Sequence, residues 1–529
     1  MNTGLSGLCT VLVWWLMALH VVAADDPTWS PEITISEFDN VGDILHFEDS
    51  SKLLLHSFDG AYFSKDSGKN WSKLPLSDEN GDEPRVTGIQ EFTYQPNAAM
   101  IFTSSGKTMY TFDQGENWDY VDFPVTDSVF GNAQINYANN DYMLFKFISF
   151  DNYTVVEQTF YSKDKLKTVP AEVKVDNLGE CTFTKINPEF TQGPDEHIIC
   201  IMNEMNSFNV LQSSELATTD DFFDNLISSD VSHLDGLNAR KITVVKNFVI
   251  VEASKDRYLA DFSALYTSKD GKSFYKAFFE DHEKGWMFNV LGSTLDSLYI
   301  SVFERNSGYG MASSNIFRSD SDGRYFKKIF GDVFSNILGM SLISKVQTLD
   351  GVWGASHNVE YNGMQFPKSK SMITFDDGEN WSYLNITDSE SCNNDDECSL
   401  HIAWLTQRAG NGDLVTGETP GIQLGVGNVG KYLDHSFDKL KTFVSRDGGL
   451  SWQKVSDTPT VFAFGDLGNI LVTVPVNVEY FMEGKADKSA KSISYSLDQG
   501  QTWTEVPLPS KIVPLYFVNN KDNSEKTFD

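Results

Sequence analysis

The sequence has 529 residues and a formal net charge of −33, with 74 acidic and 41 basic side chains. This balance excludes nucleic acid as a partner, because phosphates require a basic surface, and it disfavours membrane faces rich in anionic lipid. It suits a soluble protein or a receptor for basic segments.

The first 24 residues have the pattern of a secretory signal peptide. Leu8–Ala23 is almost wholly apolar, and the run ends in small residues that suit a cleavage site. The run is short for a membrane span, and no later segment reaches the roughly 18 apolar residues that a span needs. We therefore expect residues 1–24 to be removed and the rest to lie in the secretory-pathway lumen (Golgi or endosome) or to be secreted.

A turn motif known as the Asp-box, Ser/Thr-x-Asp-x-Gly-x-x-Trp, recurs along the mature chain. Five copies are complete, and their Asp and Trp positions are Asp66 and Trp71, Asp113 and Trp118, Asp376 and Trp381, Asp447 and Trp452, and Asp498 and Trp503. Two shorter copies carry Asp270 and Asp322 and end at Phe274 and Phe326.

These residue types suit a hairpin turn rather than a catalytic site. An Asp side chain can accept hydrogen bonds from the backbone of its own turn, and Gly tolerates a positive φ. The Trp or Phe buries a large apolar area against neighbouring strands. We therefore interpret the Asp-boxes as structural.

The spacing of the boxes predicts the architecture. The gap from Trp118 to Phe274 is 156 residues, or three steps of 52. Two degenerate copies, Ser162–Val169 and Thr219–Leu226, fall where that period requires them and keep the hydroxyl and the Asp. One turn motif per roughly fifty residues is typical of a β-propeller with four-stranded blades.

Short β-branched runs such as Lys241–Val245 and Asn247–Glu252 agree with this interpretation, and we find no convincing amphipathic helix of three turns. We predict an all-β fold, a large β-propeller of about ten four-stranded blades with Asp-box turns, because roughly 500 residues remain after the signal.

Four cysteines remain once Cys9 leaves with the signal, and they allow three disulfide connectivities. Local pairing, Cys181 with Cys200 and Cys392 with Cys398, is the simplest. Neither pair has zinc-knuckle spacing and no histidine cluster accompanies them, so we expect no metal and no cofactor.

Four sequons are present, at Asn70, Asn152, Asn380 and Asn385. We expect glycosylation at Asn152 and Asn385. Asn70 and Asn380 lie inside Asp-boxes with the anchoring Trp in the middle position, so we expect these two to be modified poorly.

The segment around the last cysteine pair carries a family resemblance. Ser391–Ile402 follows one Asp-box, and Gly425–Gly430 and then Thr442–Trp452 follow in turn. This order resembles the sortilin family of sorting receptors, and most of all its fungal vacuolar protein-sorting receptors, over about residues 30 to 508.

By itself Gly425–Gly430 also matches a dinucleotide-binding fingerprint, but it runs into another Asp-box strand instead of a helix, and we interpret it as a tight turn.

The resemblance implies a ten-bladed propeller, without enzymatic activity, whose wide central tunnel binds peptides or proteins. Members of the family carry such cargo between the Golgi and endosomes, and fungal members sort soluble hydrolases to the vacuole. The expected partners are therefore soluble cargo proteins or peptides, in particular vacuolar hydrolases.

One candidate ligand residue follows from the resemblance. Sortilin-like receptors place an Arg in a tunnel strand to meet a ligand carboxylate, and the stretch Thr348–Trp353 puts Asp350 at the matching position. An acidic residue there would prefer a basic ligand group.

The resemblance also divides the chain. Residues 25–508 correspond to the propeller, and 509–529 are expected to be a truncated last blade or a disordered tail. Family receptors continue into a cysteine-rich module, a membrane span and a cytoplasmic tail, which are not seen here. We therefore considered a shortened paralogue, a truncated product, a fragment and a non-transporting soluble decoy.

The main alternative is an Asp-box glycosidase of the sialidase or xyloglucanase type. A sialidase needs an arginine triad and a Tyr/Glu nucleophile pair. None of the eight arginines lies in the usual Arg-Ile-Pro context, and no Gly-x-Ser-x-Gly nucleophile motif occurs in the mature chain. The sequence therefore favours a binding protein.

Overall fold

The computed structural model describes residues 31–38, 41–77, 81–125, 128–151, 154–205, 211–228, 234–255, 263–280, 287–305, 312–335, 341–346, 348–360, 368–387, 398–403, 415–416, 420–434, 436–476, 490–512, 517 and 528. The chain forms two compact units, Met1–Ile35 and Ser36–Asp529. The predicted signal peptide lies outside the described residues. Among those residues, no helix combines the length and the apolar character that crossing a membrane requires.

The described part of the second unit is built from antiparallel groups of four strands, which we call blades and number in chain order; the sixth and seventh blades are hydrogen-bonded to each other in one larger sheet. Blades 1 to 3 are β1 (Val41–His46), β2 (Leu53–Ser57), β3 (Gly60–Ser64) and β4 (Ser72–Lys73); β5 (Val86–Glu91), β6 (Ala99–Thr103), β7 (Lys107–Thr111) and β8 (Asp119–Asp122); and β9 (Ser128–Ile135), β10 (Met143–Asp151), β11 (Thr154–Ser162) and β12 (Ala171–Glu172). Blades 4 to 6 are β13 (Leu178–Phe183), β14 (Ile198–Met205), β15 (Leu211–Thr219) and β16 (Ile227–Ser228); β17 (Asn238–Val245), β18 (Phe248–Ser254), β19 (Ser263–Ser268) and β20 (Tyr275–Lys276); and β22 (Met287–Ser293), β23 (Leu298–Arg305), β24 (Ala312–Ser319) and β25 (Tyr325–Ser335).

Blades 7 to 9 are β26 (Ile343–Lys345), β27 (Trp353–Glu360), β28 (Lys368–Thr374) and β29 (Ser382–Tyr383); β30 (Ser399–Ile402), β32 (Gln423–Gly430), β33 (Lys441–Ser445) and β34 (Gln453–Ser456); and β35 (Thr460–Gly465), β36 (Ile470–Pro475), β37 (Ala490–Ser496) and β38 (Thr504–Ile512). Two short strands, β21 (Phe278–Phe279) and β31 (Val415–Thr416), add to β25 and β32. The connections that the structure describes include the 3-10 turns η1 (Leu234–Gly236), η3 (Phe437–Lys439) and η4 (Asp466–Gly468). The all-β propeller prediction is confirmed; the described residues form nine blades where about ten were expected, and each of the nine boxes recognised in the sequence belongs to one of them.

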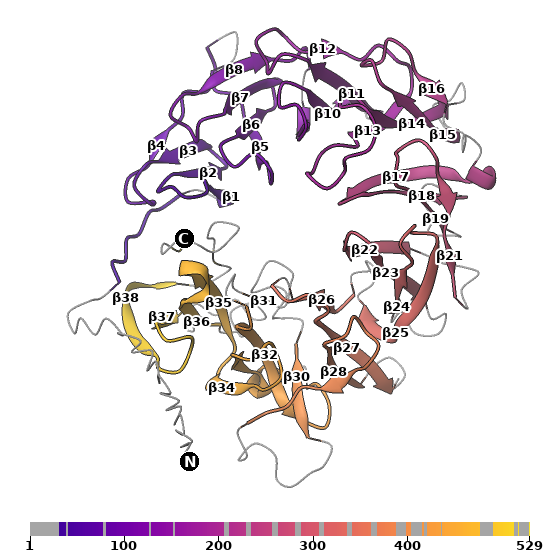
Figure 1. Cartoon of the computed structure of the whole chain (residues 1–529). Helices are drawn as coiled ribbons and strands as arrows, with labels where there is room; N and C mark the ends of the chain where they lie inside the picture. Colours follow the sequence, from indigo (N-terminus) through magenta and orange to yellow (C-terminus); the bar gives the residue numbers. More distant parts are fainter. Residues whose placement is uncertain are drawn as a thin grey trace, which may run out of the picture. The chain divides into compact units, whose positions relative to one another are not determined.

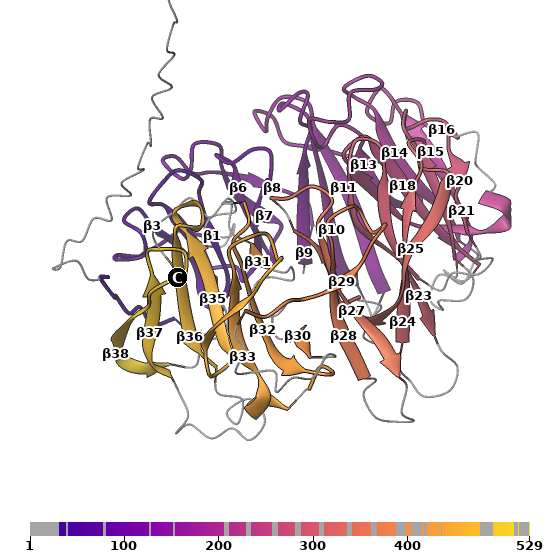
Figure 2. The same ribbon diagram turned by 60° about the horizontal axis from the view of Figure 1, so that its bottom comes forward.

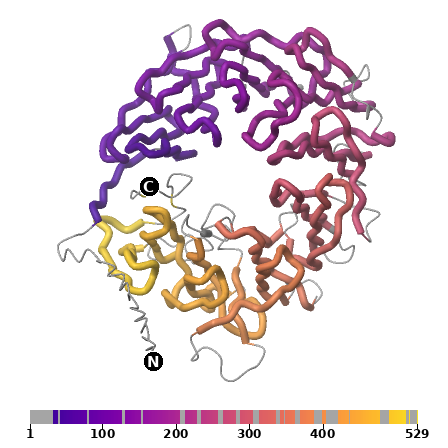
Figure 3. Tube along the Cα trace, viewed as in Figure 1, coloured from indigo at the N-terminus to yellow at the C-terminus, as the bar shows by residue number. Residues whose placement is uncertain are grey.

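Within the second unit the blades follow one another in chain order round a common centre, with first strands such as β1, β5, β17, β22 and β26 on the inner side (Figures 1 and 3). Figure 2 shows that strands of neighbouring blades run in similar directions. The Asp-boxes connect the third and fourth strands, away from these first strands.

The five complete Asp-boxes close their turns with the same hydrogen bonds. In blade 2 the Thr111 hydroxyl donates to Asp113 (2.8 Å) and accepts from the Gly115 N–H (2.8 Å), and Asp113 accepts from the Asn117 N–H (2.9 Å). The degenerate copies fold identically, because the N–H groups of Leu166 and Phe223 donate to the hydroxyls of Ser162 and Thr219, both at 3.1 Å. Leu166 and Phe223 adopt positive φ angles of 63° and 72° in place of glycine.

The box of one blade packs against the sheet of the blade before it. A Cβ atom on Gly115 of blade 2 would lie 2.5 Å from the Phe63 ring of blade 1, and Trp118 meets the same ring edge-on at 5.8 Å. In blade 7, the Trp381 ring stacks 4.0 Å from Phe330 of blade 6 and its Nε1–H donates to the Ile329 carbonyl (3.3 Å). The boxes therefore join neighbouring sheets as well as closing their own turns.

The box of blade 6 departs from the sequence assignment. Its carboxylate acceptor is Asp320, which receives hydrogen bonds from the N–H groups of Arg324 (2.8 Å) and Tyr325 (3.2 Å). Asp322, the residue assigned from the motif, directly precedes Gly323, whose N–H donates to the Asp320 carbonyl (3.1 Å). The acceptor lies one residue after the hydroxyl rather than two, which the motif pattern does not anticipate.

The glycine-rich segment 425–430 is part of strand β32 and not a tight turn. β32 pairs with β30, with Gly427 opposite Ile402. A Cβ atom on Gly427 would stand 1.9 Å from the His401 carbonyl oxygen, whereas on Gly430 its nearest neighbour would be 3.6 Å away. Gly427 is therefore required by the close approach of two strands.

His401 is buried at the junction of blades 7 and 8. Its Nδ1 accepts the Ser371 N–H (3.1 Å) and its Nε2 lies 3.0 Å from the Gly430 carbonyl. This pairing requires a neutral ring that donates through Nε2. Burial lowers the pKa of His401 from 6.5 to about 4, and the nearby Lys370 acts in the same direction.

Two further predictions concern the cysteines and the end of the chain. Cys181 and Cys200 lie directly opposite each other in β13 and β14 and form the predicted disulfide. Cys398 is disulfide-bonded, and its predicted partner Cys392 lies outside the described residues. Strand β38 continues to Ile512, which pairs with Ala490, so the expected boundary at residue 508 falls inside a strand.

The blade 6 turn supplies a direct comparison of two neighbouring carboxylates. Asp320→Ala should lower the free energy of unfolding by about 1–2 kcal/mol, because two turn N–H groups lose their acceptor. Asp322→Ala should change it by less than about 0.5 kcal/mol. Urea unfolding of both variants measures the difference, and equal losses would show that Asp320 is not the acceptor that matters.

The close approach at Gly427 predicts a strong local sensitivity. Gly427→Ala should destabilise the protein by about 1–3 kcal/mol, because the added methyl overlaps a backbone carbonyl. Gly430→Ala is the matched control in the same strand and should stay within about 0.5 kcal/mol of the parent. Thermal and urea unfolding measure both, and a harmless Gly427→Ala would contradict the register.

The buried neutral His401 predicts a loss of stability in acid. Its pKa is about 4 when folded and 6.5 when free, so below pH 6.5 the unfolded chain binds a proton that the folded chain does not. The contribution of neutral His401 to the free energy of unfolding is complete above pH 6.5 and falls as the pH drops towards 4. The total loss is on the order of 3 kcal/mol.

Urea unfolding between pH 7.5 and 4.5 tests this prediction. In His401→Gln the fall in stability over this range should be shallower than in the parent. A His401→Gln variant with the parental pH profile would refute the proposed titration.

Candidate functional site

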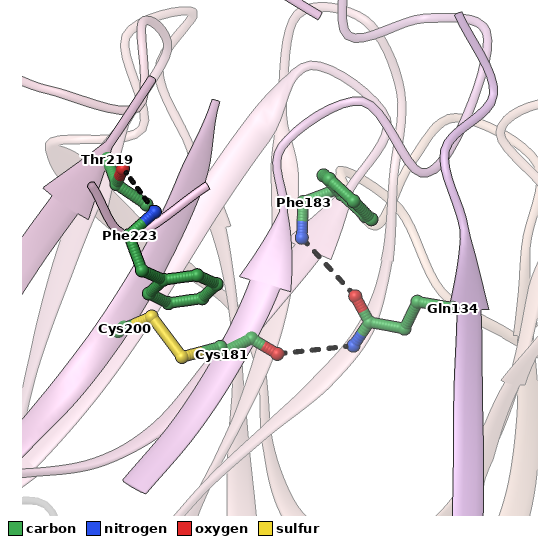
Figure 4. The surroundings of a disulfide bond; sticks show 6 residues. All are labelled: Gln134, Cys181, Phe183, Cys200, Thr219 and Phe223. Atoms are coloured by element: carbon green, nitrogen blue, oxygen red, sulfur yellow. Dashed lines mark hydrogen bonds between the residues drawn. A yellow bond between two sulfur atoms is a disulfide. The ribbon is translucent and has the colours of Figure 1, made fainter. Parts of the chain in front are cut away.

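Side chains on the first strands connect neighbouring blades on the inner side. Gln90 of β5 donates to the Ala133 carbonyl (2.7 Å) and accepts the Ala133 N–H (2.9 Å) of β9. Gln134 of β9 repeats the arrangement on β13, with the Cys181 carbonyl (3.4 Å) and the Phe183 N–H (3.3 Å), as Figure 4 shows beside the disulfide. These amide groups tie blades 2, 3 and 4 together.

The next blade uses a carboxyl group in the same role. Glu180 of β13 accepts the Ile242 N–H of β17 at 3.2 Å. Burial raises the pKa of Glu180, and this hydrogen bond together with Lys146 and Lys241 acts against that rise. Lys146 itself pairs with Glu157 (2.8 Å). A band of alternating charges thus crosses blades 3, 4 and 5.

The junction of blades 5 and 6 contains a cavity instead. A cavity of ≈ 220 Å³ separates β17 from β22, which are neighbours on the inner side in Figure 1. Its walls are Lys241, Thr243 and Val245 of β17, Ile250 and Glu252 of β18, Leu265 of β19 and residues 288–292 of β22. Among described strands β22 pairs only with β23, so its inner edge is not used by the described sheet.

A β-bulge brings opposite charges to this cavity. The β17–β18 register shifts between Ala239 and Lys241, which places Lys241 opposite Glu252 and makes Arg240 the extra residue. The Arg240 guanidinium lies 3.6 Å from the Glu252 carboxylate, and both side chains are largely buried. Bulges commonly redirect side chains at functional sites.

The environment of Glu252 disfavours its negative charge. Burial raises the pKa of Glu252, and Arg240 and Lys241 partly oppose the rise. A buried carboxylate gains from an additional cation, because charge interactions strengthen away from water. The site is thus able to bind a positively charged group.

The lining residues combine apolar walls with a few polar groups. They are mainly aliphatic, with the polar groups of Lys241, Thr243, Glu252 and Asn289, and include no His, Cys or Ser. In the part of the chain that the structure describes, no group of three potential metal ligands was found.

Asp350 lies elsewhere. It occupies the turn between β26 and β27 rather than a strand, its side chain is 93% exposed, and it pairs with Lys345 at 2.8 Å. Hydrogen bonding to Lys345 holds the pKa of Asp350 below its usual range. A ligand role for Asp350 stays a prediction, and its charge already has a partner.

The sequons occupy different environments. The side-chain amides of Asn70 and Asn380 donate to the box carboxylates Asp66 (2.6 Å) and Asp376 (2.7 Å). Asn385 is exposed, and Asn152 lies outside the described residues. In the folded protein the two box asparagines thus have their amide nitrogens engaged, which agrees with the poor modification expected of them.

The sequence reasoning recognised the strands that carry Lys241 and Glu252 but gave neither residue a role. The only available signal was the pair of basic residues, Arg240 and Lys241, at the start of a β-branched strand. Without the bulge and the pairing with Glu252, that pair resembles any polar strand end.

Comparison with known proteins gives a consistent family. The family model described as Sortilin-Vps10 (Sortilin, neurotensin receptor 3) matches residues 59–517. Curated relatives include Vacuolar protein sorting/targeting protein 10 of Candida albicans and of Candida dubliniensis, each 31% identical over 547 residues and covering 97% of this chain and 33% of the relative. The Debaryomyces hansenii protein of that name is 31% identical over 549 residues, covering 97% and 34%.

The chain thus spans about a third of the length of these relatives. Among solved structures, a xyloglucanase from Xanthomonas campestris is similar with a TM-score of 0.36 and 13% identity, over 90% of this chain and 75% of that one. A similarity of this size carries no argument about function.

Proposed function

Because this chain belongs to the Sortilin-Vps10 family, we propose that its propeller binds soluble cargo in the secretory-pathway lumen for delivery to the vacuole. The relatives are named for vacuolar protein sorting and targeting. Transport of vacuolar hydrolases from the Golgi to endosomes is the corresponding activity of the whole receptor, and binding is the part we assign to this chain.

The cavity at the junction of blades 5 and 6 is the observation that supports cargo binding most directly. It combines an available strand edge on β22 with a buried carboxylate, Glu252. An extended cargo segment could add to that edge through its backbone while one side chain enters the cavity, as in other cases of strand addition.

The cargo side chain that fits best is basic. Glu252 is disfavoured as an anion by burial, and a Lys or Arg from the cargo would stabilise it. The net charge of −33 would also attract basic segments from a distance. Arg240, 3.6 Å from the Glu252 carboxylate, and Lys241, opposite Glu252 in the strand pair, would act as internal competitors of the cargo cation.

The same chemistry would release cargo in acid. A carboxyl group whose pKa is raised loses its charge earlier as the pH falls. Binding of a basic segment should therefore be strongest near neutral pH and should weaken as Glu252 becomes protonated in acidic compartments.

The test is binding of vacuolar hydrolases, and of basic peptides derived from those that bind, to the purified full chain at pH 7.2 and 5.0. Glu252→Gln should weaken binding at least about tenfold and flatten its pH dependence, because the titrating carboxylate is lost. Lys241→Gln should leave binding unchanged or strengthen it. Lys276→Gln is the control, because Lys276 lies on β20, at the opposite edge of blade 5 from β17, and its ammonium pairs with Asp235 at 2.9 Å. It should bind cargo like the parent.

The opposite pattern, with weaker binding in Lys241→Gln and normal binding in Glu252→Gln, would mean that the cavity takes an acidic group and would overturn this proposal. Hydrolysis of a fluorogenic glycoside panel by the purified chain would instead favour the glycosidase alternative.

A further inference from the structure

Two exposed aromatic rings lie together on the outer edge of blade 6. Strand β21 pairs in parallel with β25, so that Phe278 lies opposite Tyr325. The strand order of the blade runs from β22 to β25, and β21 adds beyond the last strand, on the outer side in Figure 1. The Phe278 and Tyr325 rings lie within 21° of parallel, with their centres 5.8 Å apart.

A guanidinium group connects a third ring to this pair. The Arg324 Cζ atom lies 3.3 Å from the centre of the Tyr275 ring of β20. Arg324 directly precedes Tyr325, and its carbonyl accepts the Phe278 N–H (2.7 Å). These four residues therefore form one continuous surface, which we call the aromatic platform.

The aromatic platform is both accessible and well supported. The exposed fractions of Tyr275, Phe278 and Tyr325 are 44%, 57% and 64%. Successive residues of a strand point to opposite faces, and the next residues, Phe279 and Phe326, stack 4.5 Å apart beneath the exposed pair. Single exposed apolar side chains are ordinary, whereas a group of them in mutual contact marks an interaction site.

The platform also carries groups that can make hydrogen bonds to a ligand. Arg324 has no ion pair with any residue that the structure describes, and its Nε atom is buried without a hydrogen-bond partner. Two of the three rings are tyrosines, whose hydroxyls can donate and accept. The exposed carboxylates Asp320 and Asp322 precede Arg324 in the same turn. Donors and acceptors thus surround the aromatic faces.

This combination selects the chemistry of the ligand. The face of an aromatic ring is negative and attracts polarised C–H groups, and a pyranose ring presents C–H groups on one face and hydroxyls round its edge. An acidic ligand would be repelled by a chain of net charge −33. A wholly apolar ligand would cover the Arg324 donors without pairing them, which costs free energy.

We propose that the aromatic platform binds a pyranose ring of a carbohydrate, with the exposed rings against its C–H face and Arg324 donating to its oxygens. The sugar can belong to a glycan carried by a protein or to a free polysaccharide, because both present the same ring. The platform lies on the outer edge of blade 6, whereas the cavity beside Glu252 is walled by the inner strands β17 and β22. Sugar binding is therefore independent of the cargo binding proposed above.

The test is saturation-transfer difference NMR on the purified full chain with two probes. Mannopentaose represents protein-linked glycans and cellopentaose represents free polysaccharides. Saturation should pass from the protein mainly to C–H hydrogens on one face of a pyranose ring, and titration at millimolar sugar should saturate at one site. The probe that binds more tightly identifies the source, and binding of either one supports the proposal.

Exposed positions allow variants that keep the fold, which an unchanged thermal midpoint would verify. Phe278→Ala and Tyr325→Ala should each weaken sugar binding about fivefold or more, because a stacking face is lost. Tyr325→Phe keeps the ring and should stay within about twofold of the parent. Tyr120→Ala is the matched control, because Tyr120 is also an exposed tyrosine of a fourth strand with a cation, Lys107, over its ring at 4.0 Å. It should bind sugar like the parent.

Four outcomes would overturn the proposal. The first is the absence of saturation transfer to both probes, and the second is undiminished binding in both alanine variants. The third is loss of sugar binding in Glu252→Gln, which would move the sugar to the inner cavity. The fourth is a dimer in analytical ultracentrifugation that Tyr325→Ala dissociates while neither sugar binds. In that case the platform is a contact between two copies of the chain.

Discussion

The packing of each Asp-box against the preceding sheet is the interaction on which the rest of this structure depends. A propeller blade is a small sheet with two faces to cover, and its own residues cannot cover both. The box brings a glycine and an aromatic ring onto the neighbouring blade, as Gly115 and Trp118 do on Phe63. Because the turn is closed by its own hydroxyl and carboxylate, the aromatic side chain is held in one direction, and successive blades keep a constant relationship.

Because successive blades keep a constant relationship, the contacts between one pair of neighbouring blades can be compared with those between the next pair. The differences between these blade junctions indicate function. Gln90, Gln134 and Glu180 fasten three successive junctions on the inner side. The following junction has a cavity with a bulged strand and a desolvated carboxylate. Blades 7 and 8 are joined differently again, by a buried neutral histidine and a glycine that allows close strand approach. The aromatic platform lies where a fifth strand, β21, is added to blade 6. A repeated scaffold thus carries chemistry where its repeat is interrupted.

Sequence reasoning succeeded where one residue type has one structural use. The degenerate boxes at Ser162 and Thr219 were located from spacing, and their turns retain the predicted backbone even with Leu166 and Phe223 at positive φ. It failed where a similar pattern has two uses. Asp320 replaced Asp322 because a one-residue offset still satisfies the turn, and the glycines at 425–430 serve strand contact rather than a turn. Asp350 was assigned by alignment to a strand, but the chain turns there.

The sequence by itself determined the repeating unit and the family and favoured the local pairing of Cys181 with Cys200, because each depends on short-range spacing that is visible along the chain. Only the tertiary structure decided which charged groups meet. Lys241 and Glu252 face each other across two strands through a bulge that no local pattern announces. Tyr275 and Arg324 are 49 positions apart, as their numbers show, and come into contact only because blade 6 packs on blade 5. Electrostatic sites depend on distances between blades, and those distances are set by the packing of every box in between.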